Sequence, residues 1–158
     1  GDLPTGSVLQ VKHSSREGNN SVITFSASSG ESALYSTGFG NRTYNLAATI
    51  NITPLSTDSI LLCFGQVGWT SMDATSTMAH GQIITLNDTT AINPEDYPWY
   101  PHSIHGEFYY PSQHIQGVFE PNSTSEQTIR LRPYVYIESG SGTGRFVGHD
   151  LIVMEIAG

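Results

Sequence analysis

Alternation with a period of two residues is the feature of this sequence that most constrains its fold. Short alternating segments are bounded by clusters of Gly, Pro, Asn and Ser, and none has the apolar spacing of a strong amphipathic helix. This pattern is typical of β-strands. Without helices to cover a parallel sheet, such strands pack as two antiparallel layers. We therefore predict an all-β chain that forms an antiparallel two-sheet β-sandwich with a jelly-roll-like topology.

The most apolar segment, residues 59–69, is predicted to be a central strand. Its apolar side chains occupy both faces, because Ile60, Leu62 and Phe64 alternate with Leu61 and Cys63. Successive residues of a strand point to opposite sides of the sheet. A strand that is apolar on both sides is therefore expected in the middle of a sheet, and we predict residues 80–86 as its neighbour.

Eight or nine strands are expected in total. Residues 7–13 and 22–26 are predicted to pair as a hairpin around a turn at residues 16–20, and residues 27–40 are predicted to be a surface loop. A second hairpin is expected between residues 103–110 and 114–119. Further strands are predicted at residues 44–52, 128–138, 145–147 and 151–156.

The segment at residues 128–138 alternates most regularly. Its inward-facing set is predicted to be Ile129, Leu131, Val135 and Ile137, and the residues between them are expected to face outward. Pro133 interrupts this segment, and proline has no N–H to donate to a neighbouring strand. Its presence indicates either an edge strand or a bulge.

Length and charge exclude several classes of function. A chain of 158 residues is long enough for one buried core, so we expect a single domain over residues 1–158. The formal net charge of -8 opposes the phosphate contacts through which proteins bind nucleic acids and anionic membranes. No apolar run approaches the roughly 20 residues of a membrane helix, so no membrane insertion is expected. The one cysteine, Cys63, has apolar neighbours that predict burial.

The densest aromatic region, residues 96–110, contains the predicted binding residues. Aromatic rings beside polar groups can stack on sugar rings while the polar groups hold the hydroxyls. In the alternative interpretation, Pro98 and Pro101 stiffen a loop whose aromatic side chains pack against the end of the sandwich. Both interpretations stay open from the residues alone. The candidate ligand-binding residues are Tyr97, Trp99, Tyr100, His102, His105 and Glu107.

The sequence supports a set of catalytic residues less well than it supports a binding segment. Glu95, Asp96 and Glu107 could flank a glycosidic bond as the carboxylates of a glycosidase do, but acidic loop residues are usually only solvated. No serine lies in a G-x-S-x-G elbow. His149 and Asp150 are adjacent and would point to opposite faces of a strand, which disfavours a hydrogen bond between their side chains. We therefore expect no catalytic residue.

The histidines offer one further hypothesis. His102, His105 and His114 are imidazoles of the kind that bind Zn, Ni or Fe(II). Their H-x-x-H spacing suits a helix, whereas this part of the chain is predicted to be loop and strand. Exposed or hydrogen-bonded loop histidines are the alternative, and we expect no metal and no cofactor.

Three short blocks follow one another along the chain: GSVLQV at residues 6–11, NITPLSTDSILLCFGQV at residues 51–67 and LIVMEI at residues 151–156. In this order they resemble a domain of bacteriophage virion appendages, which occurs in tail fibres and in capsid knob or fibre proteins, notably of marine podoviruses. In that family a G-x-V-L-Q-V strand opens the domain, an I-T-P-x-S-x-x-S stretch precedes the central strand, and a strand ending in E-I closes it.

The resemblance implies a non-catalytic, homotrimeric β-sandwich on the surface of the phage particle. Its partners would be other virion proteins and a host cell-surface receptor, with a glycan as one candidate. The chain would be either complete or the C-terminal part of a longer appendage protein. The long aromatic region departs from the family pattern, so receptor recognition is expected there.

Two alternatives to an attachment domain remain. The first is a polysaccharide-degrading domain that uses the carboxylates at residues 95, 96 and 107. The second is a purely structural trimerisation or capping module. In the second case, the two-sided apolar strands at residues 59–67 and 151–156 would lie in the core and in the subunit interface together.

Overall fold

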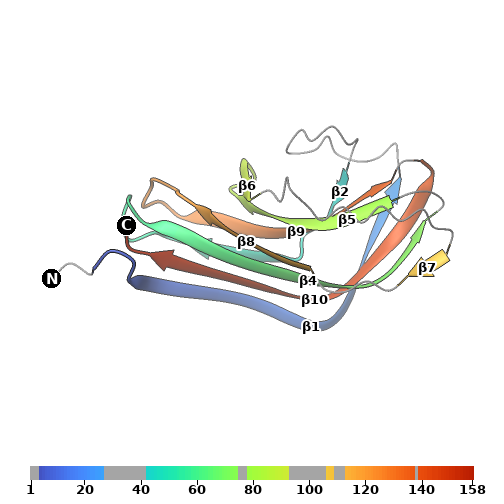
Figure 1. Ribbon diagram of the computed structural model, residues 1–158, viewed down its shortest axis with the longest axis horizontal. Coiled ribbons are helices and arrows are strands. Elements are labelled where there is room, and N and C mark those ends of the chain that lie inside the picture. The colour runs from blue at the N-terminus through green and yellow to red at the C-terminus, as the bar shows by residue number, and fades with distance from the viewer. Residues whose placement is uncertain (1–3, 27–41, 75–77, 93–105, 109–112, 138) are drawn as a thin grey trace.

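Two antiparallel sheets packed face to face form the molecule (Figure 1). A computed structural model describes residues 4–26, 42–74, 78–92, 106–108, 113–137 and 139–158. Within these ranges the chain forms strands and no helix, and hence no helix that could cross a membrane. The strands are β1 (Val8–Ser26), β2 (Arg42–Tyr44), β3 (Ala48–Ile52), β4 (Ile60–Ala74), β5 (Met78–Leu86), β6 (Thr90–Ile92), β7 (Gly106–Phe108), β8 (Gln113–Phe119), β9 (Gln127–Ile137) and β10 (Ser141–Ile156).

The order of the strands confirms the predicted fold class. The first sheet has the order β1-β10-β4, with β7 and β8 both paired to the far edge of β4. The second sheet has the order β2-β9-β5-β6, with β3 also paired to β9. If β2 with β3, and β7 with β8, each count as one interrupted strand, the first strand pairs with the last and the second pairs with the last but one. This nesting is that of a jelly roll.

The core lies between the two sheets. From the first sheet, alternate residues of β4 and β10 point inward, among them Leu61, Val67 and Leu151, each 0% exposed. They meet Ile129 and Leu131 of β9 from the second sheet. Strands of regular alternation pack in this way because each contributes every second side chain to the same interior.

Two strand predictions are confirmed in detail. The predicted strand at residues 59–69 lies in β4 except for Ser59, which precedes it, and β4 is central because β10 pairs with one of its edges and β8 with the other. In β9, Ile129, Leu131 and Val135 are buried as predicted. The side chain of Ile137 is outside the described part.

Pro133 marks a bulge rather than a sheet edge. Strand β9 is central in its sheet, between β5 and the pair of short strands β2 and β3. The break between β2 and β3 lies opposite Pro133, where the Asn45 N–H donates to the Pro133 carbonyl at 2.8 Å and the Ala47 N–H donates to the Leu131 carbonyl at 2.9 Å. The predicted strand at residues 44–52 is therefore divided in two.

The predicted hairpin between residues 7–13 and 22–26 is wrong. Both segments belong to the single long strand β1, which pairs with β10 along its length. Residues 16–20 are not a turn: the register shifts between Arg16 and Asn20 while pairing continues on both sides. Glycine and asparagine are as compatible with a bulge in a strand as with a turn, so the local sequence alone did not distinguish them.

Two further pairings were predicted wrongly. Strand β5 is not a neighbour of β4, because it belongs to the second sheet and pairs with β9 and β6. Strands β7 and β8 do not form a hairpin with each other but follow one another along β4, with β7 opposite Met72–Ala74 and β8 opposite Leu61–Val67. Topology, which local periodicity does not encode, sets these neighbours.

The predicted strands at residues 145–147 and 151–156 form one continuous strand, β10. The register with β4 shifts between Val147 and His149, and Gly148 has a φ of 64°. A positive φ is favourable for glycine, so the strand bends here without ending. The predicted loop at residues 27–40 lies outside the described residues.

Candidate functional site

The predicted binding segment lies mostly outside the described residues. This applies to Tyr97, Trp99, Tyr100, His102 and His105, and also to Glu95 and Asp96 of the glycosidase hypothesis. The backbone of Glu107 is described in β7, where it pairs with Asp73 of β4. The interpretations of this segment therefore stay predictions.

A candidate functional surface is the outer face of the first sheet, which points away from the second sheet. The register aligns its residues in rows across β1, β10, β4 and β8. Directly paired residues of antiparallel strands project from the same face, so each row forms a band of side chains about 5 Å from one to the next. Three such rows follow one another along the strands, and the side chains change from apolar in the first row to polar in the third.

The first band, here the apolar row, consists of Val11, Met154, Leu62 and Val118. Val11 is 54% exposed and Val118 is 48% exposed, and the two residues between them are half-buried. An apolar band that crosses four strands is larger than the single exposed hydrophobic residues common on protein surfaces. The row is therefore a candidate contact surface.

The second band, the mixed row, consists of His13, Ile152, Phe64 and Gln116. Ile152 and Phe64 are half-buried in the middle, and His13 and Gln116 are exposed at the two ends. An apolar centre with a polar group at each end can contact a ligand that has both kinds of surface.

The third band, the polar row, consists of Ser15, Asp150, Gln66 and His114. Asp150 is tied to the mixed row, because the His13 Nε2 lies 2.9 Å from the Asp150 Oδ1. Both side chains are more than half exposed, so this pair contributes little to stability. It joins the edge strand β1 to β10 at this row.

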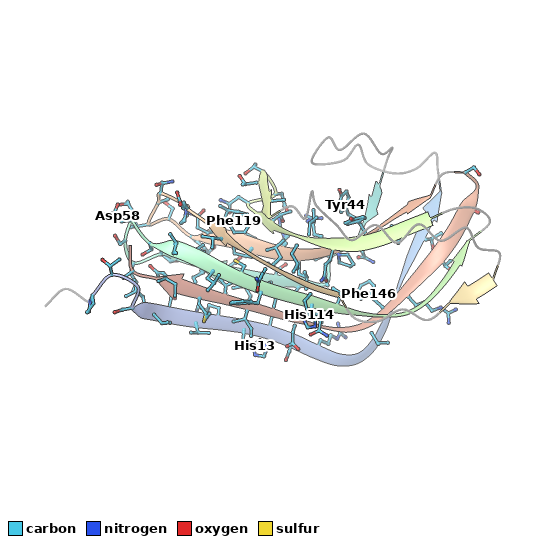
Figure 2. All side chains as sticks on the ribbon, viewed as in Figure 1. His13, Tyr44, Asp58, His114, Phe119 and Phe146 are labelled. Carbon is cyan, nitrogen blue, oxygen red and sulfur yellow. The ribbon has the colours of Figure 1, made fainter. Side chains whose placement is uncertain are left out.

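The mixed and polar rows line an open groove of about 750 Å³. Figure 2 shows His13 and His114 on the outer side of the first sheet, on strands β1 and β8. The groove is lined by His13, Phe64, Gly65, Gln66, His114, Ile115, Gln116, Asp150 and Ile152. Its volume is within the range of about 300–1,000 Å³ usual for small-molecule sites.

His149 lies apart from this groove. Its Nε2 is 3.3 Å from the Ser14 Oγ, while Asp150 contacts His13 instead. The predicted separation of His149 and Asp150 onto opposite faces is thus confirmed. Burial lowers the pKa of His149, the nearby Asp150 carboxylate acts in the opposite direction, and Arg16 lowers it further.

In the described ranges, no three His, Cys, Asp or Glu side chains lie together so that they could hold one metal ion. His114 is exposed on the outer face, and its two predicted companions lie outside the described residues.

Cys63 is confirmed as a buried core residue. It is 0% exposed, and its Sγ donates to the Leu61 carbonyl at 3.7 Å. Burial raises the pKa of the thiol to about 12, so the reactive thiolate is scarce at neutral pH. Its role is packing.

A buried carboxylate, Glu155 of β10, connects three distant parts of the chain. It is 0% exposed and accepts hydrogen bonds at 2.6 Å from the Leu55 backbone N–H and from the Gln10 Nε2. Gln10 also donates to the Thr53 carbonyl at 2.8 Å. Burial alone would raise the pKa of Glu155, but its hydrogen bonds outweigh burial and lower it.

The comparisons with known proteins are informative for structure only. The sequence matches no protein-family model and no curated protein. A solved chain of the infectious bursal disease virus Gx strain has 12% sequence identity and a TM-score of 0.52 over 93% of this chain. The fold is similar to one found in a virus. The VP2 subviral particle of infectious bursal disease virus gives 12% identity, a TM-score of 0.47 and 96% coverage of this chain.

This chain spans only part of those proteins. It covers 34% of the length of each of the two viral chains. At this identity the similarity establishes a shared sandwich fold and no shared residue role.

The sequence indicated part of the outer face. It placed Ile60, Leu62 and Phe64 on a common side of one strand, and β4 has them there. It did not indicate the groove, because Asp150 and His114 meet Gln66 only through strand pairings between distant segments.

Proposed function

We propose that the chain is a non-catalytic surface domain of a virus particle, of the kind found in bacteriophage tail fibres and capsid knobs, and that it acts as a homotrimer. The jelly-roll fold supports the viral part of the proposal, since a chain of infectious bursal disease virus has a similar fold. The three sequence blocks support the more specific comparison with phage appendages. The proposed homotrimer rests on the apolar row, which can form a contact between copies of the chain.

The apolar row exposes hydrophobic side chains to water, and we propose that a second copy of the chain packs against it. With a net charge of -8, copies of the chain repel one another over most of their surface. The row of Val11, Met154, Leu62 and Val118 contains no charged side chain. Association is therefore least opposed at this row, and burying it removes exposed apolar surface from water.

A ring of three copies requires two different contact surfaces on each copy. The apolar row lies at the border of one of them, because the mixed row beside it lines the open groove. This contact surface extends in the other direction, toward the next outward row of Val8, Ile156 and Ile60, where Val8 is 53% exposed. A stable interface buries about 800 Å² on each partner, which is more than one row of four side chains offers. Residues beyond the row must complete the contact.

Attachment to a host receptor is the role we propose for the domain in the particle. The loop residues predicted from the sequence, Trp99 and Tyr100 foremost among them, remain the first candidates for receptor contact. Loops carried on a rigid sandwich commonly bind partners in this way.

Particle labelling tests the location. Antibodies raised against the folded chain should label intact particles purified from the cells in which the chain is made, as seen by electron microscopy. Antibodies raised against an unrelated β-sandwich are the control. Recovery of the chain only in fractions without particles would overturn the proposal.

A further inference from the structure

The groove beside the apolar row has the composition of a ligand site. Its floor is formed by Phe64 of β4 and Ile152 of β10, which are directly paired and both half-buried. The apolar row borders this floor on one side, and polar side chains border it at its two ends and on the other side: His13, Asp150, Gln66, His114 and Gln116.

Three of these polar side chains have free hydrogen-bonding capacity. Gln66, His114 and Gln116 form no side-chain hydrogen bond with any other residue in the described ranges. Each has both donor and acceptor capacity, for histidine in its neutral form. They flank the phenyl ring, because Gln116 is paired with Phe64 and His114 is paired with Gln66.

The Asp150 carboxylate lies at the edge of the groove beside His13, and this contact joins β1 to β10. Both side chains are more than half exposed, so the carboxylate can still accept hydrogen bonds from a ligand in the groove.

The charges in the groove select the chemical class of the ligand. Its lining contains a carboxylate and neither lysine nor arginine. An anionic ligand such as a phosphate, sulfate or acidic sugar would lack a permanent cationic partner and would face the carboxylate of Asp150. The ligand should therefore be uncharged and rich in hydroxyl groups.

We infer that this groove binds an uncharged pyranose residue of a surface glycan. A pyranose has an apolar face of C–H groups, which can lie on Phe64 and Ile152, and hydroxyls at its rim, which can bond with Gln66, Gln116 and Asp150. The biological meaning of this inference rests on the proposed attachment role. The groove is a different site from the predicted loop at residues 97–107, and it lies on rigid strands.

Saturation-transfer NMR with methyl glycosides of glucose, galactose, mannose and N-acetylglucosamine tests the inference. At least one of these probes should receive saturation from the wild-type chain and shift the backbone amide signals of Phe64 and Gln116. Phe64→Leu removes the stacking surface and Gln116→Ala removes one hydrogen-bonding side chain. Each change should weaken binding at least about fivefold, consistent with the loss of one aromatic or polar contact.

Thr49→Val is the control. It is exposed on β3 of the second sheet, outside both the groove lining and the apolar row, so its affinity for the probe should equal that of the wild type. Thermal unfolding of each variant shows that the fold is kept. Gln116→Ala provides this test even if Phe64→Leu fails to fold, because Gln116 is exposed.

Three results would overturn the inference. One is the absence of binding by all four probes. Another is binding that neither groove variant weakens, and the third is a set of shifted signals that lies away from the groove. None of these results changes the particle-labelling outcome, so the groove can fail while the proposed viral location stands. Conversely, unlabelled particles would overturn the location even if a probe binds in the groove.

Discussion

Glu155→Ala should lower the free energy of unfolding by about 3 to 5 kcal/mol, since hydrogen bonds to a charged group contribute about 1.5–3 kcal/mol each. The change leaves the Leu55 N–H and the Gln10 amide without their acceptor in a partly buried position, and it removes a carboxylate that is 0% exposed. Urea unfolding with an unchanged dependence on denaturant measures this loss. Glu120→Ala, at an exposed position, is the control and should stay within about 0.5 kcal/mol of the wild type.

Acid titration tests the same carboxylate independently. The folded-state pKa of Glu155 is lowered relative to its ordinary value of 4.5. Its contribution is therefore fully present above the unfolded-state pKa and is lost as the pH falls through the folded-state pKa. Glu155→Gln should flatten this acid branch of the stability curve. Equal acid branches in the two proteins, or a loss below about 1 kcal/mol for Glu155→Ala, would contradict the role given to Glu155.

Gly65→Val should destabilise the sandwich by about 3 kcal/mol, at the upper end of the costs of overpacking a core. A Cβ at Gly65 would lie 2.8 Å from the Leu131 Cδ1, 3.1 Å from the Ile115 Cγ2 and 3.2 Å from the Ile84 Cδ1. Leu131 and Ile84 are both 0% exposed and belong to the opposite sheet, so they have little space into which to move. Thermal or urea unfolding measures the effect.

A double-mutant cycle identifies the cause of this loss. If contact with Leu131 is responsible, then Gly65→Val combined with Leu131→Ala should be more stable than the sum of the single effects by about 1 kcal/mol or more. Thr49→Val, at an exposed position of β3, controls for the general preference of valine for strands and should be close to neutral. Strict additivity would show that the glycine serves another purpose.

Sequence periodicity predicted the layers of this fold more reliably than its pairings. In β4 and β9, side chains such as Leu61 and Leu131 are buried where the alternation places them. The partners of each strand were harder to predict, because they depend on which distant segments close the jelly roll. Residues 7–26 illustrate this: their local sequence suits a hairpin, yet the whole segment pairs with β10.

Residues from the three short sequence blocks at residues 6–11, 51–67 and 151–156 meet in the fold. Gln10 comes from the first block, Leu55 from the second and Glu155 from the third, and they meet in one partly buried hydrogen-bonded network. The side chains of Gln10 and Glu155 are needed for this network, whereas the second block contributes backbone groups, the Leu55 N–H and the Thr53 carbonyl. These blocks therefore contribute to holding β1, β10 and the segment before β4 together.

The candidate site could be predicted from the sequence only in part, because it depends on pairings between strands that are distant along the chain. The apolar half of the outer face follows from the two-sided pattern at residues 59–67 and 151–156. The groove does not, since Asp150, Gln66 and His114 form one row only after β10 and β8 have paired with opposite edges of β4. No local pattern relates residues so far apart along the chain.

The native mass of the purified chain, measured by light scattering over a dilution series, tests the proposed homotrimer most directly. The chain has a mass of 17.1 kDa, and we expect three times this value to persist on dilution. Val118→Asp places a charge in the apolar row and should shift the mass toward that of one chain. A wild-type mass of 17.1 kDa at every concentration would contradict the assembly, and with it the role assigned to the apolar row.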